Sequence, residues 1–218
     1  DNYLLLDSFR ENKSLIKNSE CTVHDIGDGV MCIEFTSKSN SIGEGIGHGI
    51  DQAIKMAEEE GWKGIVIGNN AKQFSVGANL MNVGMLAMQK QFDTLDTVIE
   101  GFQNLNMRIR TSKIPVVVAT QGYVFGGGCE IAMHCDAGIY AAESYIGLPE
   151  VGVGLLPAGG GVKELALRAS NKFFEGDVKI PTLLDHFKTI ATATISTSAH
   201  EAYNLGFLEE GRDHVWCN

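Results

Sequence analysis

Short apolar runs alternate with amphipathic helical stripes along most of the chain. Residues 21–26 and 30–36 form two strand-like runs, and they flank an Asp-Gly turn at residues 27–29. This arrangement predicts a β-hairpin. It is followed by a predicted helix that ends at Gly61 and whose apolar stripe is Ile46, Ile50, Ala53, Ile54 and Ala57.

The rest of the chain continues this alternation. Asn79 ends the loop at residues 69–79 and is a suitable N-cap for the next helix. Strands are predicted at residues 64–69, 116–120 and 137–143, and helices at residues 92–109, 129–135, 162–170 and 199–205. Because strands and helices alternate, we expect an α/β fold in which helices cover largely parallel sheets.

Two segments are less regular. Residues 1–19 contain apolar clusters without a clean period, and we expect them to be a linker or the tail of a preceding segment. Residues 20–218 are expected to form one domain. Within it, residues from about 170 to 198 combine a weak helical pattern with a Thr/Ser-rich stretch, and we interpret them as an insertion.

Composition narrows the classes of partner. The formal net charge is −10, from 17 basic and 27 acidic residues, which argues against nucleic acid or an anionic membrane as partner. It does not exclude a small anionic ligand. The five cysteines include no C-x-x-C pair and are expected to be free, mostly buried thiols. No apolar run approaches the roughly 20 residues of a transmembrane helix and no signal peptide is visible, so we expect a soluble, cytoplasmic protein.

Three consecutive glycines, Gly126, Gly127 and Gly128, separate a predicted strand from a predicted helix. Such a turn leaves backbone N–H groups uncovered at the positive end of the helix dipole, where they stabilise a phosphate or a developing oxyanion. Close packing of the helix on the sheet explains the same glycines. The turn alone leaves both interpretations open.

Several common sites are absent from the sequence. There is no G-x-x-x-x-G-K-[ST], no G-x-G-x-x-G that opens a helix after a strand, and no G-x-S-x-G. No histidine pair has metal-ligand spacing, so His134 is expected to be a core or surface residue, and no metal site is predicted. Two carboxylates remain in apolar surroundings, Glu130 and Glu150. Each also has an ordinary explanation: Glu130 as a favourable first-turn acid, and Glu150 as a solvated loop residue.

The stretch "GGGCEIAMHCDAGIYAAESYIGLPEVGVGLLPAGGG" resembles the core signature of the crotonase superfamily, the enoyl-CoA hydratases and isomerases. "QFSVGANL" is similar to the Phe-x-x-Gly-Ala-Asp loop of that family, and "NSI" to its Asn-Ala-Leu. The resemblance implies a crotonase-like α/β fold, a spiral of ββα repeats with covering helices. "IGLPE" looks most like hydratase domains that share one chain with a 3-hydroxyacyl-CoA dehydrogenase.

The resemblance also implies site residues. The backbone N–H groups of Ala78 and Gly127 would form an oxyanion hole for the thioester oxygen of an acyl-CoA. Glu130 and Glu150 would hold a water between them, and the backbone N–H of Ala158 would help to position it. Contacts to coenzyme A are expected from Lys38, Ser39, Val76 and Gly77.

The family pattern is not matched everywhere. Asn79 stands where the family has Asp, Met81 replaces a basic residue, and Ala158 replaces a glycine. Family members usually continue with C-terminal helices beyond the point that corresponds to Asn218, and we expect these helices to be truncated here. No cofactor is implied beyond the coenzyme A thioester as substrate. A homo-oligomer, a trimer in the family, and a covalently linked 3-hydroxyacyl-CoA dehydrogenase domain are implied as partners.

The two carboxylates favour an enoyl-CoA hydratase of fatty-acid β-oxidation, which adds water syn to trans-2-enoyl-CoA and gives 3-hydroxyacyl-CoA. The alternatives are an enoyl-CoA double-bond isomerase that uses one glutamate, and a non-catalytic acyl-CoA-binding module of a larger enzyme. Acyl-chain length is left open. Met85, Leu86 and Met88 follow the oxyanion loop as candidates for an acyl pocket, although methionine at helical spacing more often belongs to a core.

Overall fold

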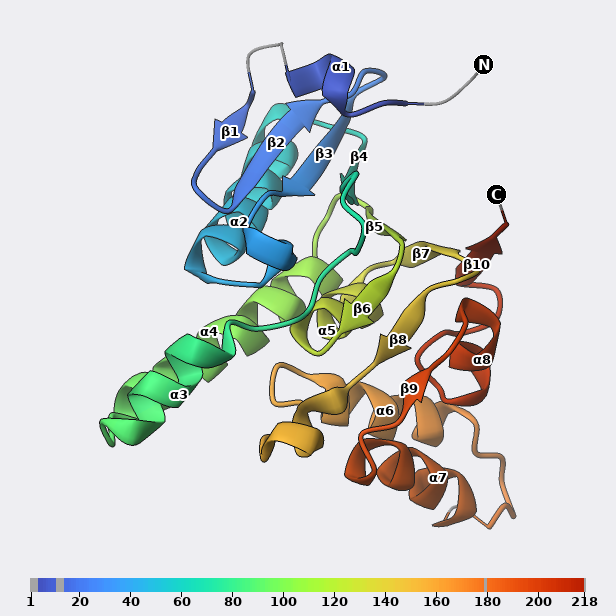
Figure 1. The fold of residues 1–218 in the computed structure, drawn as a ribbon. Coiled ribbons are helices and arrows are strands. Elements are labelled where there is room, and N and C mark those ends of the chain that lie inside the picture. Colours follow the sequence, from blue (N-terminus) through green and yellow to red (C-terminus); the bar gives the residue numbers. More distant parts are fainter. Residues whose placement is uncertain (1–3, 11–13, 179, 218) are drawn as a thin grey trace.

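The computed structural model describes residues 4–10, 14–178 and 180–217, and two sheets organise it (Figure 1). The larger has the order β1-β2-β3-β4-β5-β7-β10 and the smaller the order β6-β8-β9. The strands are β1 (Ile16–Lys17), β2 (Cys21–Asp25), β3 (Val30–Phe35), β4 (Gly64–Ile67), β5 (Val116–Thr120), β6 (Tyr123–Phe125), β7 (Ala137–Ala141), β8 (Tyr145–Gly147), β9 (Ile195–Ser196) and β10 (Asp213–Trp216).

Helices connect and cover these strands (Figure 1). The helices are α1 (Asp7–Arg10), α2 (Glu44–Glu60), α3 (Leu80–Met88), α4 (Phe92–Arg110), α5 (Gly127–His134), α6 (Gly161–Asn171), α7 (Ile180–Ala191) and α8 (Ala199–Asn204), with short 3-10 turns η1 (Lys38–Asn40) and η2 (Pro149–Val153). Within the described residues, no helix combines the length and the hydrophobicity that a transmembrane span requires.

The predicted hairpin is confirmed. β2 and β3 are antiparallel, with Asp25 opposite Met31, and the turn between them places Gly27, Asp28 and Gly29 at positive φ. From β3 to β10, all neighbouring strands of the larger sheet are parallel. The expectation of a largely parallel sheet is therefore confirmed from β3 onward. The pairs β1–β2 and β2–β3 are antiparallel, because hairpin connections are too short for parallel pairing.

A buried core holds the sheets and helices together. β-branched side chains from neighbouring strands, such as Ile33, Ile65 and Val118, are at most 1% exposed, and Ile50 and Ile54 of α2 cover them. Each such side chain contributes roughly 1.5–3 kcal/mol by leaving water. The predicted stripe of α2 is thus the buried face of that helix, and Gly61 ends it at φ 75°.

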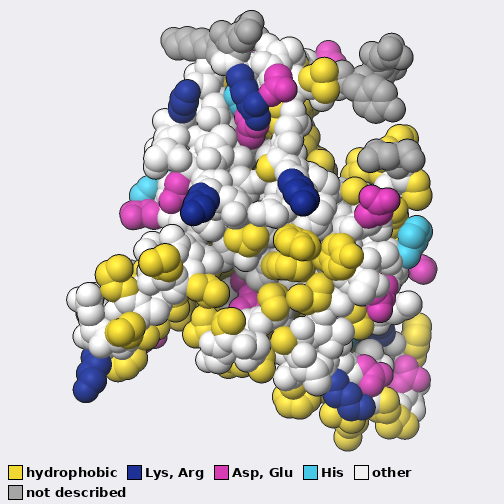
Figure 2. All heavy atoms as spheres, viewed as in Figure 1, with side chains coloured by type: hydrophobic (Ala, Val, Ile, Leu, Met, Phe, Trp, Pro, Cys, Tyr) yellow, Lys and Arg dark blue, Asp and Glu magenta, His cyan; other side chains and the backbone are white. Residues whose placement is uncertain are grey.

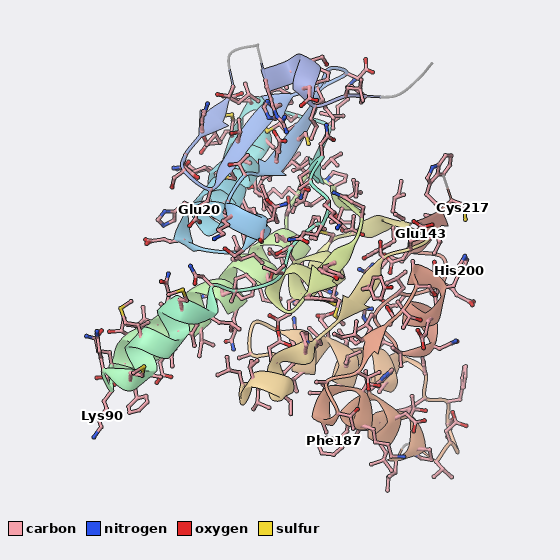
Figure 3. The ribbon with its side chains drawn as sticks, in the orientation of Figure 1. Glu20, Lys90, Glu143, Phe187, His200 and Cys217 are labelled. Atoms are coloured by element: carbon pink, nitrogen blue, oxygen red, sulfur yellow. The ribbon has the colours of Figure 1, made fainter. Side chains whose placement is uncertain are left out.

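Glu20 anchors the start of α2 from outside the helix (Figure 3). Gly43 precedes the helix and has no side chain to cap it, and the backbone N–H of Ile46 donates instead to Oε2 of Glu20, at 3.1 Å. A Cβ on Gly43 would lie 2.3 Å from Oε1 of Glu20. The glycine is therefore needed so that the carboxylate can reach the positive end of the helix.

α3 and α4 form an arm that projects from the body of the molecule (Figure 1). Asn79 caps α3 as predicted, because its Oδ1 accepts from the N–H of Met81 at 3.1 Å. α3 has no buried residue, and Met85 and Met88 are 51% and 87% exposed, so the assignment of these methionines to a core is wrong. Figure 2 shows hydrophobic side chains along this arm, and Lys90 marks its tip in Figure 3.

The irregular segments contain more regular structure than the sequence pattern specified, beyond the weak helix expected within residues 170–198. Ile16 and Lys17 form β1 and pair with β2, so the sheet begins inside the range expected to be a linker. Of that range, residues 1–3 and 11–13 lie outside the described residues. Part of the expected insertion forms α7, which packs against α6; residue 179 is not described. Four of the cysteines are buried thiols as expected, whereas Cys217 is exposed.

Candidate active site

The parallel pairing of β6 and β8 positions the segments that carry the candidate site residues. Phe125 lies opposite Gly147, so the chain leaves both strands at the same edge of the small sheet. Beyond β6 comes the glycine turn, and beyond β8 comes η2, which carries Glu150. The N–H of Gly126 donates to the carbonyl oxygen of Gly147, at 3.0 Å. This bond holds the segments that follow β6 and β8 next to each other.

The loop that contains Gly77 and Ala78 lies against the glycine turn. Ser75 pairs with β6, because its N–H donates to Tyr123 O and its carbonyl oxygen accepts from Phe125 N, both at 3.0 Å. A Cβ on Gly77 would lie 2.9 Å from the carbonyl oxygen of Phe125 and 3.3 Å from the nitrogen of Gly127. Gly77 also has a φ of 88°, so only glycine fits this contact without strain.

Two backbone N–H groups remain available at this contact. The N–H of Ile42 donates to Gly77 O at 2.8 Å, and the carbonyl oxygen of Ile42 accepts from Asn79 N at 3.3 Å. The N–H of Ala78, between these two bonds, is left free. Gly127 is the first residue of α5. In the part of the chain that the structure describes, neither Ala78 nor Gly127 donates its N–H to a protein acceptor. The two donors lie in adjoining segments, at the positive end of α5, where they suit a negatively charged oxygen.

The structure gives a steric reason for two of the three glycines. A Cβ on Gly128 would lie 2.7 Å from Cβ of Ser75, so this glycine allows close packing. A Cβ on Gly126 would lie 3.0 Å from Oε1 of Glu150, so this glycine leaves room for a carboxylate. The turn is therefore a packing contact and a wall of the site at once.

Glu130 lies in the first turn of α5 and is 3% exposed. Its Oε1 accepts a hydrogen bond from the N–H of Gly161, at 2.8 Å. Burial raises the pKa of Glu130 to about 7, and the charge of Glu150 adds to this rise. The amides of Gly159, Gly160 and Gly161 act in the opposite direction, because they stabilise the ionised carboxylate.

Glu150 is half-buried, and its Oε2 has no hydrogen-bond partner among the described residues. Burial raises the pKa of Glu150 to about 7, and a hydrogen bond from its own backbone amide limits the rise. Two carboxyl groups beside one glycine turn therefore titrate close to neutral pH. One can be ionised while the other is protonated, which is the condition for a combined base and acid.

Comparison with known proteins assigns the family. Residues 25–176 match the family model described as enoyl-CoA hydratase/isomerase. The chain belongs to this family. It is 41% identical over 206 residues to a probable 3-hydroxyacyl-CoA dehydrogenase of Bacillus subtilis (strain 168), which covers 94% of this chain and 26% of that protein. It is 34% identical over 139 residues to the mitochondrial enoyl-CoA hydratase of Pongo abelii, which covers 63% of this chain and 46% of that one.

Solved structures agree on the fold. The enoyl-CoA hydratase from Thermoplasma volcanium GSS1 superimposes with a TM-score of 0.74 at 22% identity, over 91% of this chain and 72% of that one. The crotonase-like α/β fold and the membership of the crotonase superfamily are therefore confirmed. The chain spans 26% and 46% of the length of the two relatives above.

The residues expected to contact coenzyme A lie on two loops that hydrogen bonds join. Lys38 and Ser39 are exposed in η1, and Val76 and Gly77 belong to the loop before α3. Nδ2 of Asn40 donates to Gln73 O at 3.0 Å, and Oγ of Ser75 donates to Asn40 O at 2.7 Å. The two loops that carry the family-derived set are therefore neighbours, and contact of these residues with coenzyme A stays a prediction.

Ala158 is the predicted residue that fits its expected role least well. Its N–H donates to the carbonyl oxygen of Leu156 at 2.7 Å and is not left free for a water. The following three amides, of Gly159, Gly160 and Gly161, are the ones that act on Glu130. The polar donors of this loop thus lie one to three residues later than the family pattern implies.

His134 is a buried support of the site. Its Nδ1 contacts Glu130 O at 2.6 Å and its Nε2 contacts Nζ of Lys163 at 2.8 Å. Burial lowers the pKa of His134 to about 4, so the ring is neutral: Nδ1–H donates and Nε2 accepts. Glu164 lies beside it and binds Arg110 and Lys163; although burial opposes ionisation, the positive charges of Lys163 and Arg110 lower the pKa of Glu164.

Sequence reasoning missed the polar residues of α4 that hold this part of the site. Asn106 is fully buried and binds Gly159, and Gln103 binds Ala158. Phe102 also reaches the site, because a Cβ on Gly127 would lie 3.1 Å from its Cζ. The available signal in the sequence was Asn106 itself, an asparagine at a position where the helical stripe predicts burial. This signal is weak because the sequence does not show that Gly159 is its hydrogen-bond partner.

Proposed function

We propose that the chain is a 2-enoyl-CoA hydratase domain that adds water to trans-2-enoyl-CoA and forms 3-hydroxyacyl-CoA. The observation that carries the proposal is the pair of carboxyl groups, Glu130 and Glu150, both with a pKa of about 7, beside two free backbone N–H groups. A reaction that needs one base, one acid and hydrogen-bond donors for an oxyanion has all these groups beside one glycine turn.

In the proposed reaction, the thioester carbonyl oxygen accepts hydrogen bonds from the N–H groups of Ala78 and Gly127. The ionised carboxylate of the pair takes a proton from water while the water oxygen forms a bond to C3. The electrons of the C2=C3 double bond move toward the thioester oxygen, which the two N–H groups stabilise. The protonated carboxyl then delivers a proton to C2. Because both carboxyls border the same turn, we propose syn addition.

The relatives support hydration as the reaction. Besides the mitochondrial enoyl-CoA hydratase, a crotonyl-CoA hydratase of Syntrophomonas wolfei is 37% identical over 103 residues. The match to a 3-hydroxyacyl-CoA dehydrogenase much longer than this chain supports a further proposal. The chain acts within, or next to, a protein that oxidises the 3-hydroxyacyl-CoA product.

The test is a turnover assay with product analysis. The chain is mixed with trans-2-enoyl-CoA of short, medium and long acyl chain, and the loss of enoyl-thioester absorbance is followed. The expected product is the 3-hydroxyacyl-CoA. A shifted double bond as the main product would assign an isomerase instead. Binding of acyl-CoA by calorimetry without turnover of any chain length would leave the site as a binding module and refute the hydratase.

A further inference from the structure

Two amide side chains of α4 bind consecutive carbonyl groups of the loop before α6. Nε2 of Gln103 donates to Ala158 O at 2.7 Å, and Nδ2 of Asn106 donates to Gly159 O at 2.8 Å. Both carbonyl oxygens are therefore turned toward α4.

The direction of these carbonyls fixes the direction of the next N–H groups. The described residues contain no cis peptide bond, and in a trans peptide the C=O and the N–H point in opposite directions. When Ala158 O and Gly159 O face α4, the N–H groups of Gly159 and Gly160 face away from it. These are two of the amides that stabilise the ionised form of Glu130. The helix α4 thus orients donors toward a carboxylate that it does not itself bind.

Asn106 is an unusual choice for its position. Its side chain is fully buried, and its Oδ1 has no hydrogen-bond partner in the described part of the protein. Exchange of the amide nitrogen and oxygen would place oxygen against Gly159 O, so the contact fixes the orientation. An apolar side chain of similar size would remove this unpaired oxygen but would leave Gly159 O without its donor. The clear effect of the asparagine is therefore on the orientation of the peptide 159–160.

We infer that Asn106 is a positioning residue for Glu130, with Gln103 in a supporting role. Asn106 holds the peptide 159–160 and Gln103 holds the peptide 158–159. The N–H groups of Gly160 and Gly159 are thereby kept in the orientation that favours ionisation of the buried Glu130. The consequence for turnover rests on the proposed hydratase function. The consequence for the ionisation of Glu130 does not.

The test measures that ionisation directly. The band of the protonated carboxyl is followed by infrared difference spectroscopy from pH 5 to pH 9 and assigned with Glu130→Gln. Asn106→Leu removes the donor at similar volume, and Gln103→Met removes the neighbouring donor at an exposed position. The matched control is Asn104→Leu, an exposed amide of α4 whose side chain makes no hydrogen bond within the described residues.

We expect the midpoint of Glu130 to lie near 7 in the unaltered chain and to rise by about 1 pH unit in Asn106→Leu. A smaller rise is expected in Gln103→Met, and none in Asn104→Leu. If Asn106→Leu does not fold, the midpoint of Glu130 in Gln103→Met, a substitution at an exposed position, is the test of the inference. A Glu130 midpoint that stays in place in the folded variants overturns the inference.

Kinetics with a trans-2-enoyl-CoA separate this inference from the proposed function. If the chain is a hydratase, kcat of Asn106→Leu falls by about tenfold or more, KM changes little, and the pH limb that belongs to Glu130 moves with the infrared band. If the unaltered chain shows no turnover but the band still moves, the hydratase proposal fails and the positioning role stands. If turnover is present and neither the band nor the pH limb moves, only the positioning role fails.

Discussion

The backbone N–H of Gly161 and the carboxylate of Glu130 are joined by a hydrogen bond of 2.8 Å. Gly161 is the first residue of α6, and Glu130 lies in the first turn of α5, so the positive ends of two helices meet at one carboxyl group. A Cβ on Gly161 would lie 2.7 Å from Cδ1 of Leu148 and 3.1 Å from Oε1 of Glu130. This glycine is therefore required for the approach that keeps a buried acid able to ionise.

Loss of either carboxylate should abolish most of the activity. In the proposed hydration, Glu130→Gln and Glu150→Gln each remove one proton-transfer group and are expected to lower kcat by about 100-fold or more, while acyl-CoA binding persists. Turnover of a trans-2-enoyl-CoA and calorimetric binding measure the two effects. The matched control is Glu143→Gln, an exposed carboxylate away from the glycine turn (Figure 3). Undiminished turnover in either site variant would contradict the two-carboxylate mechanism.

The pH dependence of kcat/KM should be bell-shaped with a maximum near neutrality. Both carboxyls have a pKa of about 7, and the proposed hydration needs one ionised and one protonated. Activity falls below neutral pH as the base becomes protonated, and above it as the acid ionises. We expect values at pH 5 and pH 9 at least about tenfold below the maximum. A flat profile across this range would show that the pair does not share the proton.

Ionisation of Glu130 should lower the free energy of unfolding at alkaline pH. Burial raises its pKa from 4.5 to about 7, so the folded state binds more protons than the unfolded state between these values, and the stability contributed by the protonated form is lost as pH rises. Glu130→Gln cannot ionise but can still accept from Gly161. Relative to the unaltered chain, the variant should gain about 1–3 kcal/mol in free energy of unfolding between pH 5 and pH 8. Urea unfolding at the two pH values measures this difference, and an equal effect at both would contradict the raised pKa.

Much of the fold could be predicted because its signals are local. The hairpin, the stripe of α2 and the cap at Asn79 each depend on residues a few positions apart, and the structure confirms all three. Strands such as β8 and β9 escaped prediction because two or three residues carry no readable alternation. The methionines of α3 were misread because helical spacing does not reveal that the arm leaves the body of the protein.

The site likewise has features that the sequence predicts and features that only the folded structure shows. The resemblance identified Glu130 and Glu150, and the structure brings both to the glycine turn, although their catalytic roles stay predictions. The bond between Asn106 and Gly159 joins residues 53 positions apart, and no local pattern specifies such a contact. The direction of a peptide group, which decides whether Ala158 or Gly159 offers its N–H, is a property of the folded loop alone.

Glu20 should contribute to stability without touching catalysis. Glu20→Ala removes the acceptor of Ile46 N and leaves the first turn of α2 without a side-chain cap, because Gly43 supplies none. We expect a loss of about 1 kcal/mol in free energy of unfolding and unchanged kcat. Glu59→Ala is the control, since Glu59 is exposed near the other end of α2 and its side chain makes no hydrogen bond within the described residues. Equal stability of the two variants would show that the contact at Glu20 does not cap the helix.

Gly77 provides the most direct test of the two-amide site. Gly77→Ala places a methyl group 2.9 Å from Phe125 O and 3.3 Å from Gly127 N, at a φ of 88° that alanine rarely adopts. Since the obstacle is backbone, the loop must move away from the glycine turn and separate the N–H groups of Ala78 and Gly127. Loss of one oxyanion donor costs about 3–4 kcal/mol of transition-state stabilisation, so kcat should fall by about 100-fold or more. Gly84→Ala is the matched control, because a Cβ there meets nothing within 4 Å and alanine favours the helix. If Gly77→Ala folds and turns over like Gly84→Ala, these two amides do not form the oxyanion site.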